Sequence, residues 1–231
     1  MEILLTSITA GLGNSYITES KEKNYTDLKK ITFMFFWLTG MCTSCFLGIF
    51  QPFMRLWVGE KFLMGFSVVV CLCVYFYLYE TTRLLNVFKN AGGIWHEDRF
   101  RPLISAIVNL ALNLISVNYI GIYGIVLSTI VALGVIEIPW LLQNIFTVMY
   151  DTSLFKDYFK MFVSWIIATV FSCVIIAVLT YKVTFSGWGA FAFFVVVSVL
   201  IPNIVFLLLM HKTEEFKLSI STVSYTHLRA H

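Results

Sequence analysis

Long apolar runs without any charged residue alternate with short polar segments along most of the chain. Asp, Glu, Lys and Arg are absent from five runs, 31–53, 62–79, 103–136, 161–181 and 183–210. A helix needs about 20 apolar residues to cross a bilayer core of about 30 Å, and nearly every run reaches that length. The pattern therefore predicts an all-α polytopic membrane protein.

Turn-forming residues divide the runs into six complete spans. The run 103–136 is too long for one span, and Asn118, Tyr119 and Gly121 near its middle favour a hairpin of two short helices. Pro102 suits the first turn of the earlier helix. The expected spans are 31–53, 62–84, 103–119, 122–140, 161–181 and 187–210, which together form a six-helix bundle over 31–217. We also expect an interfacial helix over 141–158.

The segment before these spans is apolar but too short to cross a bilayer. Residues 1–13 run into Gly11 and Gly13 and are typical of the end of a transmembrane helix whose beginning is absent. A short interfacial helix is the alternative. We expect residues 14–30 to form a cytoplasmic loop and residues 218–231 a cytoplasmic tail.

Composition and charge agree with a membrane protein and indicate its orientation. Charged residues make up only 13% of the chain, whereas a globular domain has about a quarter. One set of loops carries 13 of the 16 Lys and Arg residues, and the alternate set carries only Arg55, Lys61 and Lys182. The positive-inside rule places the first set in the cytoplasm, with the C-terminus. The net charge of +3 comes from these short loops and does not indicate nucleic-acid binding.

Polar side chains recur on one face of the third span. Ser105, Asn109, Asn113 and Ser116 are spaced three or four residues apart and form a polar stripe on a helix. Amide groups facing hydrocarbon without partners are costly. The stripe is therefore expected either to bond to another helix or to line a hydrated cavity on the substrate path.

Small residues also recur at helical spacing. Gly40, Ser44 and Gly48 are four residues apart, as are Gly124 and Ser128. Small side chains let helix backbones approach closely in lipid. Close packing is one interpretation, and a sliding surface between moving helices is the other.

Three charged residues lie near membrane depth and are further candidates for the substrate path. Glu80 and Arg83 are three residues apart and can form a local ion pair, while Arg83 can instead attract an anionic headgroup. Glu137 lies near the cytoplasmic end of its helix, where it either has a function or simply reaches the interface.

The remaining chemical motifs do not indicate an enzyme, a metal or a cofactor. His96, Glu97 and Asp98 are consecutive and lack the helical spacing of a zinc site, so we expect a solvated loop. The five cysteines all lie in apolar runs, where we expect them to act as small apolar side chains. A membrane-embedded glycan enzyme remains an alternative, although no acid–base constellation supports it.

Several segments taken in order resemble the bacterial polysaccharide flippases of the O-antigen and capsule export type. This family belongs to the superfamily that includes multidrug and toxin extrusion exporters. The resemblance covers about residues 11–217 and rests on the order and spacing of motifs that are individually weak. The motifs are Gly11-Leu12-Gly13-Asn14, the run from Pro52 to Gly59, Ala91-Gly92-Gly93-Ile94-Trp95 with Asp98-Arg99 and Pro102-Leu103, the run from Gly121 to Ile125 with Ser128-Thr129, Phe146, and Tyr158-Phe159-Lys160.

The resemblance implies a transporter that moves polyprenyl-pyrophosphate-linked oligosaccharide across the cell inner (cytoplasmic) membrane. Members have two helix bundles, so the chain would be a C-terminal fragment that is inactive alone. The family's cationic cavity residues lie largely in helices that are absent from this sequence, and none is assigned here. The implied partners are the lipid-linked oligosaccharide, membrane lipids, a glycan polymerase and assembly proteins. A cation-coupled small-molecule exporter of the same superfamily is the alternative.

The C-terminal residues differ in character from everything before them. From Ser221 to His231 the chain shows no apolar periodicity, and it resembles a translated sequencing-adapter tail. A disordered native tail is the alternative. Neither interpretation predicts fixed contacts, because the segment has little apolar surface to offset the cost of ordering it.

Overall fold

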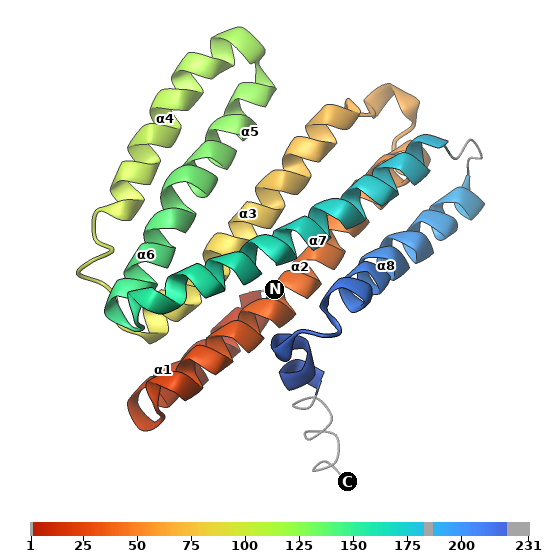
Figure 1. Cartoon of the computed structure of the whole chain (residues 1–231). Coiled ribbons are helices and arrows are strands. Elements are labelled where there is room, and N and C mark those ends of the chain that lie inside the picture. Colours follow the sequence, from red (N-terminus) through yellow and green to blue (C-terminus); the bar gives the residue numbers. More distant parts are fainter. Residues whose placement is uncertain (1, 183–186, 221–231) are drawn as a thin grey trace. The chain divides into compact units, whose positions relative to one another are not determined.

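Every regular element of the structure is helical in the residues that it describes. The structure is a computed structural model that describes residues 2–182 and 187–220. Among these residues, six helices are long and apolar enough to cross a membrane (Figure 1). They are Lys21–Trp57, Phe66–Ala91, Arg101–Ile120, Ile122–Val148, Thr152–Tyr181 and Trp188–Met210. The chain is therefore an all-α multi-pass membrane protein, as the apolar runs predicted.

The elements follow one another with short connections. α1 (Glu2–Thr18) precedes α2 (Lys21–Trp57), and the 3₁₀-helix η1 (Glu60–Phe62) leads to α3 (Phe66–Ala91). α4 (Arg101–Ile120) is followed by α5 (Ile122–Val131), the π-helix η2 (Ala132–Glu137) and α6 (Ile138–Val148). The 3₁₀-helix η3 (Thr152–Leu154) leads to α7 (Phe155–Lys182), and α8 (Trp188–Met210) precedes a last helical segment over 214–220.

Contacts within the chain divide it into two compact units. Unit 1 comprises residues 1–28 and 70–159, and unit 2 comprises residues 29–69 and 160–231. Each unit is described by itself below.

The hairpin of α4 and α5 is a main feature of unit 1. The chain reverses at Gly121, whose φ of +56° is a left-handed value that favours glycine. Close approach follows at Gly124, where a Cβ atom would lie 2.6 Å from the backbone carbonyl carbon of Ser116. Ser116 and Ser128 also lie 3.1 Å apart through their hydroxyls. The expected hairpin over 103–136 is confirmed, with its turn at Gly121.

The π-helix η2 interrupts the regular geometry of the second hairpin arm. The N–H of Ile138 bonds to the carbonyl of Leu133, five residues earlier, instead of four. Pro139 follows and cannot donate a backbone hydrogen bond, so regular α-helical bonding cannot continue unchanged through this point. Single π turns inside helices often occur at functional sites.

Unit 2 is packed through the small residues of α2. A Cβ on Gly40 would lie 2.6 Å from Thr169 Oγ1 of α7, and a Cβ on Gly48 would contact Ser198 of α8. Ser44 is fully buried, and its Oγ lies 3.6 Å from Cys173 Sγ. The stripe Gly40, Ser44 and Gly48 thus packs against α7 and α8, which supports the packing interpretation.

An aromatic stack fixes the segment over 214–220 within unit 2. Trp37 stacks on Phe206 and on Phe216, with ring centroids 5.9 Å apart in both pairs. Its indole N–H donates to Asn203 Oδ1 at 3.0 Å. Lys29 and Glu215 add an ion pair at 3.9 Å. Residues 218–220 of the expected tail are therefore helical, while residues 221–231 lie outside the described part.

Several expected elements and boundaries were wrong. Residues 14–30 are not a loop, because α1 continues to Thr18 and α2 begins at Lys21. Ser20 acts as a helix cap by accepting the N–H of Lys23 at 3.3 Å, a signal that the sequence contained. The second span begins at Phe66 instead of 62, after η1. The interfacial helix over 141–158 is absent, since α6 continues to Val148 and Asp151 starts a new element by accepting the N–H of Ser153.

Candidate functional site

Four charged side chains meet inside unit 1, where α3 ends and α4 begins. We call Lys89, Asp98, Arg101 and Glu137 the buried charge network. Lys89, Asp98 and Arg101 are only 6%, 3% and 4% exposed, and the Glu137 side chain is 12% exposed. They come from the last turn of α3, the connection after it, the first residue of α4 and the end of η2.

Arg101 and Asp98 form the centre of this network. Arg101 binds the carboxylate with two hydrogen bonds, Nε to Oδ1 at 2.6 Å and Nη2 to Oδ2 at 2.8 Å. Lys89 Nζ lies 3.3 Å from Asp98 Oδ2. Burial by itself would raise the pKa of Asp98, but the hydrogen bonds and charges of Arg101 and Lys89 outweigh it and lower that pKa. Asp98 is therefore a carboxylate in the folded protein.

The same guanidinium reaches two further groups. Arg101 Nη1 pairs with Glu137, and Nη2 donates to Asn86 Oδ1 at 3.0 Å. Asn144 Nδ2 contacts Asp98 Oδ1 at 3.4 Å, from α6. Two positive and two negative side chains are thus paired, and two amides complete their hydrogen bonding. Removing one member of a buried pair typically costs about 3–5 kcal/mol, because the other charge is left uncompensated.

The arrangement ties four segments together through paired charges, beside the buried apolar side chains of the same unit. α3, the connection 92–100, α4 and the η2–α6 arm all contribute a side chain. Such a network stabilises one geometry of these segments while all its members stay paired. We call this arrangement a charge-dependent clamp.

The structure resolves the local geometry of the predicted charged residues. Glu80 is buried and pairs with Arg83 at 3.2 Å, so the local ion pair expected from their spacing is present. Glu137 does not reach the interface as a lone carboxylate, because it binds Arg101. The expectation of a solvated loop at His96, Glu97 and Asp98 was wrong for Asp98, which is buried.

The polar stripe of α4 is turned mainly toward itself and toward α5. Asn113 Nδ2 donates to Asn109 Oδ1 at 3.3 Å, within the same helix. Ser116 makes the contact to Ser128 already described, and Ser105 is buried. Asn113 Oδ1 is buried without a hydrogen-bond partner among the described residues. The stripe supplies one bond between helices, and a role for it on the substrate path stays a prediction.

Four members of the site were not identified from the sequence. Lys89 and Arg101 were counted only as loop cations, and Asn86 and Asn144 were not considered. Spacing offered a signal, because Asn86 and Lys89 are three residues apart, as are Asp98 and Arg101. Spacing could not predict the pairing of Glu137, because its partner Arg101 lies 36 residues away along the chain.

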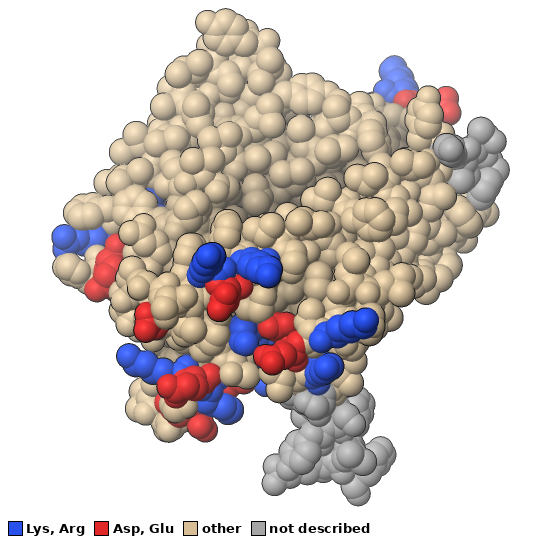
Figure 2. Space-filling model, in the orientation of Figure 1, with Lys and Arg blue, Asp and Glu red and all other residues tan. Residues whose placement is uncertain are grey.

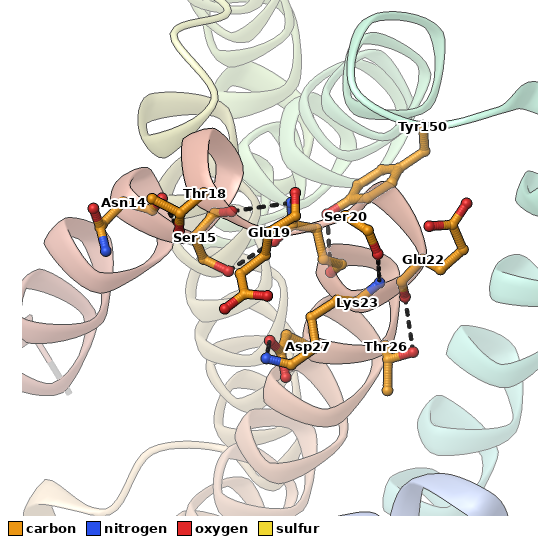
Figure 3. Close-up of polar contacts among 11 residues, drawn as sticks. Asn14, Ser15, Thr18, Glu19, Ser20, Glu22, Lys23, Thr26, Asp27 and Tyr150 are labelled. Carbon is orange, nitrogen blue, oxygen red and sulfur yellow. Dashed lines mark hydrogen bonds and ion pairs between the residues drawn. The ribbon is translucent and has the colours of Figure 1, made fainter.

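A second polar region of unit 1 surrounds the elbow between α1 and α2 (Figure 3). Tyr150 points toward this elbow from the connection just after α6. Its hydroxyl lies 3.3 Å from both the Tyr16 hydroxyl and the Asn24 carbonyl oxygen. Burial raises the pKa of Tyr16 to about 12 and also raises that of Tyr150, so both hydroxyls stay protonated.

A groove of about 740 Å³ opens beside this elbow. Its lining brings one cation and two carboxylates together with hydroxyls and two aromatic rings. The lining residues are Lys21, Glu22, Tyr25, Thr26, Thr147, Tyr150, Asp151, Thr152, Ser153 and Leu154. These side chains can bind a ligand that carries both charged and uncharged polar groups.

Metal binding finds no support in the part of the chain that the structure describes. Within residues 2–182 and 187–220, no group of three or more His, Cys, Asp or Glu side chains gathers that could hold an ion.

The chain matches no family model, no curated protein and no solved structure.

Proposed function

We propose that this chain belongs to an exporter of the polysaccharide flippase type. Its substrate would be an oligosaccharide linked to polyprenyl pyrophosphate, moved across the cytoplasmic membrane for surface polysaccharide synthesis. The proposal is supported by six helices able to cross a membrane and by the ordered motifs described above. The transfer makes and breaks no covalent bond, so the proposal requires no catalytic residue.

The buried charge network is the observation that carries the proposal. Three of its members, Lys89, Arg101 and Glu137, lie in helices that are able to cross a membrane, the first two near helix ends. Ionisable side chains in such helices are costly and often mark transport pathways. Two of its members, Asp98 and Arg101, lie in the segment 91–103, which contains some of the motifs of the resemblance. Alternating access moves one group of helices against another. A clamp made of paired charges at a helix connection can hold one of the two states.

A transport assay tests this proposal directly. Protein expressed from the complete gene is placed in vesicles that contain a short-chain polyprenyl-pyrophosphate oligosaccharide, and an added glycosidase cleaves only the sugars that reach the outer leaflet. We expect more cleavage than in protein-free vesicles, and a large loss of that gain in Glu137→Gln. Cleavage no faster than in protein-free vesicles would rule the proposal out.

A cation-coupled small-molecule exporter is the second candidate. The observation that favours it is Glu80, a buried carboxylate of α3 whose Oε2 has no hydrogen-bond partner among the described residues. A carboxylate of this kind can carry a proton or a small cation. Efflux of a lipophilic dye that follows an imposed ion gradient, and is lost in Glu80→Gln, would favour this candidate over the flippase.

A further inference from the structure

The connection between α3 and α4 presents a fixed row of exposed aromatic and basic side chains. Along residues 94–101, Ile94, Asp98 and Arg101 are buried, whereas Trp95 is 62% and Phe100 52% exposed. His96 and Arg99 are exposed as well. We call Trp95, His96, Arg99 and Phe100 the loop patch.

The buried charge network holds this patch in place from beneath. Asp98 is bound by Arg101 and Lys89, and the Lys89 ammonium also lies 4.1 Å from the centroid of the Trp95 ring. The N–H of Ile94 donates to the Lys89 carbonyl at 3.1 Å, which closes the end of α3. Two large aromatic side chains, Trp95 and Phe100, are thus exposed on a connection whose buried residues hold it to unit 1.

The patch also carries a positive group that is directed outward. The Arg99 guanidinium lies over the Phe100 ring at 4.7 Å, and its Nη1 is 2.9 Å from His96 Nε2. Of the two acidic residues in the same connection, Glu97 is exposed and Asp98 is buried. A guanidinium presents several N–H donors in a fixed plane that matches the oxygens of a phosphate.

The position along the chain places the patch at a membrane boundary. α4 begins at Arg101, and its uncharged apolar run begins at residue 103. Figure 2 shows charged atoms at the end of the α4–α5 hairpin where α4 begins, and none on the rest of its visible face. Amphipathic aromatic rings at such a boundary favour the headgroup layer, and basic residues there are attracted to anionic lipids.

We propose that the loop patch binds the phosphate of an anionic phospholipid in the surrounding membrane. Arg99 binds the phosphate, and the ring nitrogen of His96 that does not contact Arg99 binds it as well. Trp95 and Phe100 lie among the headgroups on either side. Lipid binding of this kind does not depend on what the protein transports. It would anchor the connection whose inner side forms the buried charge network.

Photo-crosslinking with two lipids tests the proposal. The purified full chain is placed in phosphatidylcholine nanodiscs that contain a small share of photoactivatable phosphatidylglycerol or, separately, photoactivatable phosphatidylcholine. Crosslinked peptides are then mapped by mass spectrometry. We expect phosphatidylglycerol to label residues 95–100 about fivefold more than phosphatidylcholine, the factor that corresponds to one basic residue at an anionic surface.

Arg99→Gln should remove that preference, and Arg99→Lys should keep most of it. Arg55→Gln is the matched control, because Arg55 also neighbours an exposed tryptophan, Trp57, but pairs with Glu60 at 3.4 Å. Equal labelling of residues 95–100 by the two lipids would overturn the proposal. A preference that survives Arg99→Gln would overturn it as well.

Discussion

Arg101 is the residue on which the buried charge network depends, because its guanidinium binds Asp98, Glu137 and Asn86 at once. The two hydrogen bonds to Asp98, at 2.6 and 2.8 Å, come from one planar guanidinium, which lysine cannot reproduce. Lys89 also pairs with Asp98, whereas the ion pair to Glu137 and the hydrogen bond to Asn86 come from Arg101. Substitution of Arg101 should therefore have larger effects than substitution of any exposed basic residue.

We expect Arg101→Met to lower the free energy of unfolding by about 3–5 kcal/mol, because it leaves Glu137 buried without its cation. The measurement is reversible unfolding in mixed detergent micelles, followed by circular dichroism. Arg99→Gln is the control, since Arg99 is exposed and such substitutions usually stay within about 0.5 kcal/mol. Equal effects for the two variants would contradict the assigned role of Arg101.

The lowered pKa of Asp98 predicts a pH dependence of stability. The unfolded chain has the ordinary value of 3.8, and the folded protein has a lower one. The stabilisation from charged Asp98 is therefore complete above the unfolded value and is lost as pH falls through the folded value. The difference in unfolding free energy between the wild type and Asp98→Asn should shrink as the pH is lowered below about 4. A constant difference from pH 7 to pH 3 would show that the carboxylate charge contributes nothing.

At the scale of elements, the α4–α5 hairpin and η2 give the second arm its geometry. The turn at Gly121 and the approach at Gly124 follow from small residues that the sequence already showed. The π turn does not follow from them. Pro139 cannot donate a backbone hydrogen bond, but nothing in the local sequence indicates that Ile138 bonds to the Leu133 carbonyl. Glu137 is the last residue of this π turn and pairs with Arg101.

Gly124→Ala should destabilise the hairpin, because its Cβ would lie 2.6 Å from the backbone of Ser116. Overpacking of this kind typically costs about 1–3 kcal/mol. Gly134→Ala is the control in the same arm, where the nearest atom to a Cβ is Leu78 Cδ1 at an ordinary 3.6 Å. The same detergent unfolding measurement compares the two, and the packing argument fails if Gly134→Ala is the more harmful change.

At the scale of the whole molecule, the six crossing helices and the uneven distribution of basic residues define a topology that can be tested. The connections at 19–20, 92–100 and 149–151 should face the cytoplasm, and those at 58–65 and 121 should face outward. Each helix that crosses the membrane places the connections at its two ends on opposite sides.

Reporter fusions at exposed positions check this topology. Fusions after Ser20, Glu97 and Ser153 should report the cytoplasm, and fusions after Glu60 and Tyr119 should report the outside. Two consecutive fusion sites on the same side would mean that the helix between them does not cross the membrane.

The sequence by itself determined the fold class, the crossing helices and the hairpin. These features depend on the length of apolar runs and on turn residues, which act locally and need no knowledge of packing. Only the tertiary structure decided which charges meet. Glu137 and Arg101 are 36 residues apart, and their pairing depends on the close approach of the two hairpin arms and on the π turn. Asp98 showed the same limit, because its sequence neighbours are solvated while its own side chain turns inward to Lys89 and Arg101.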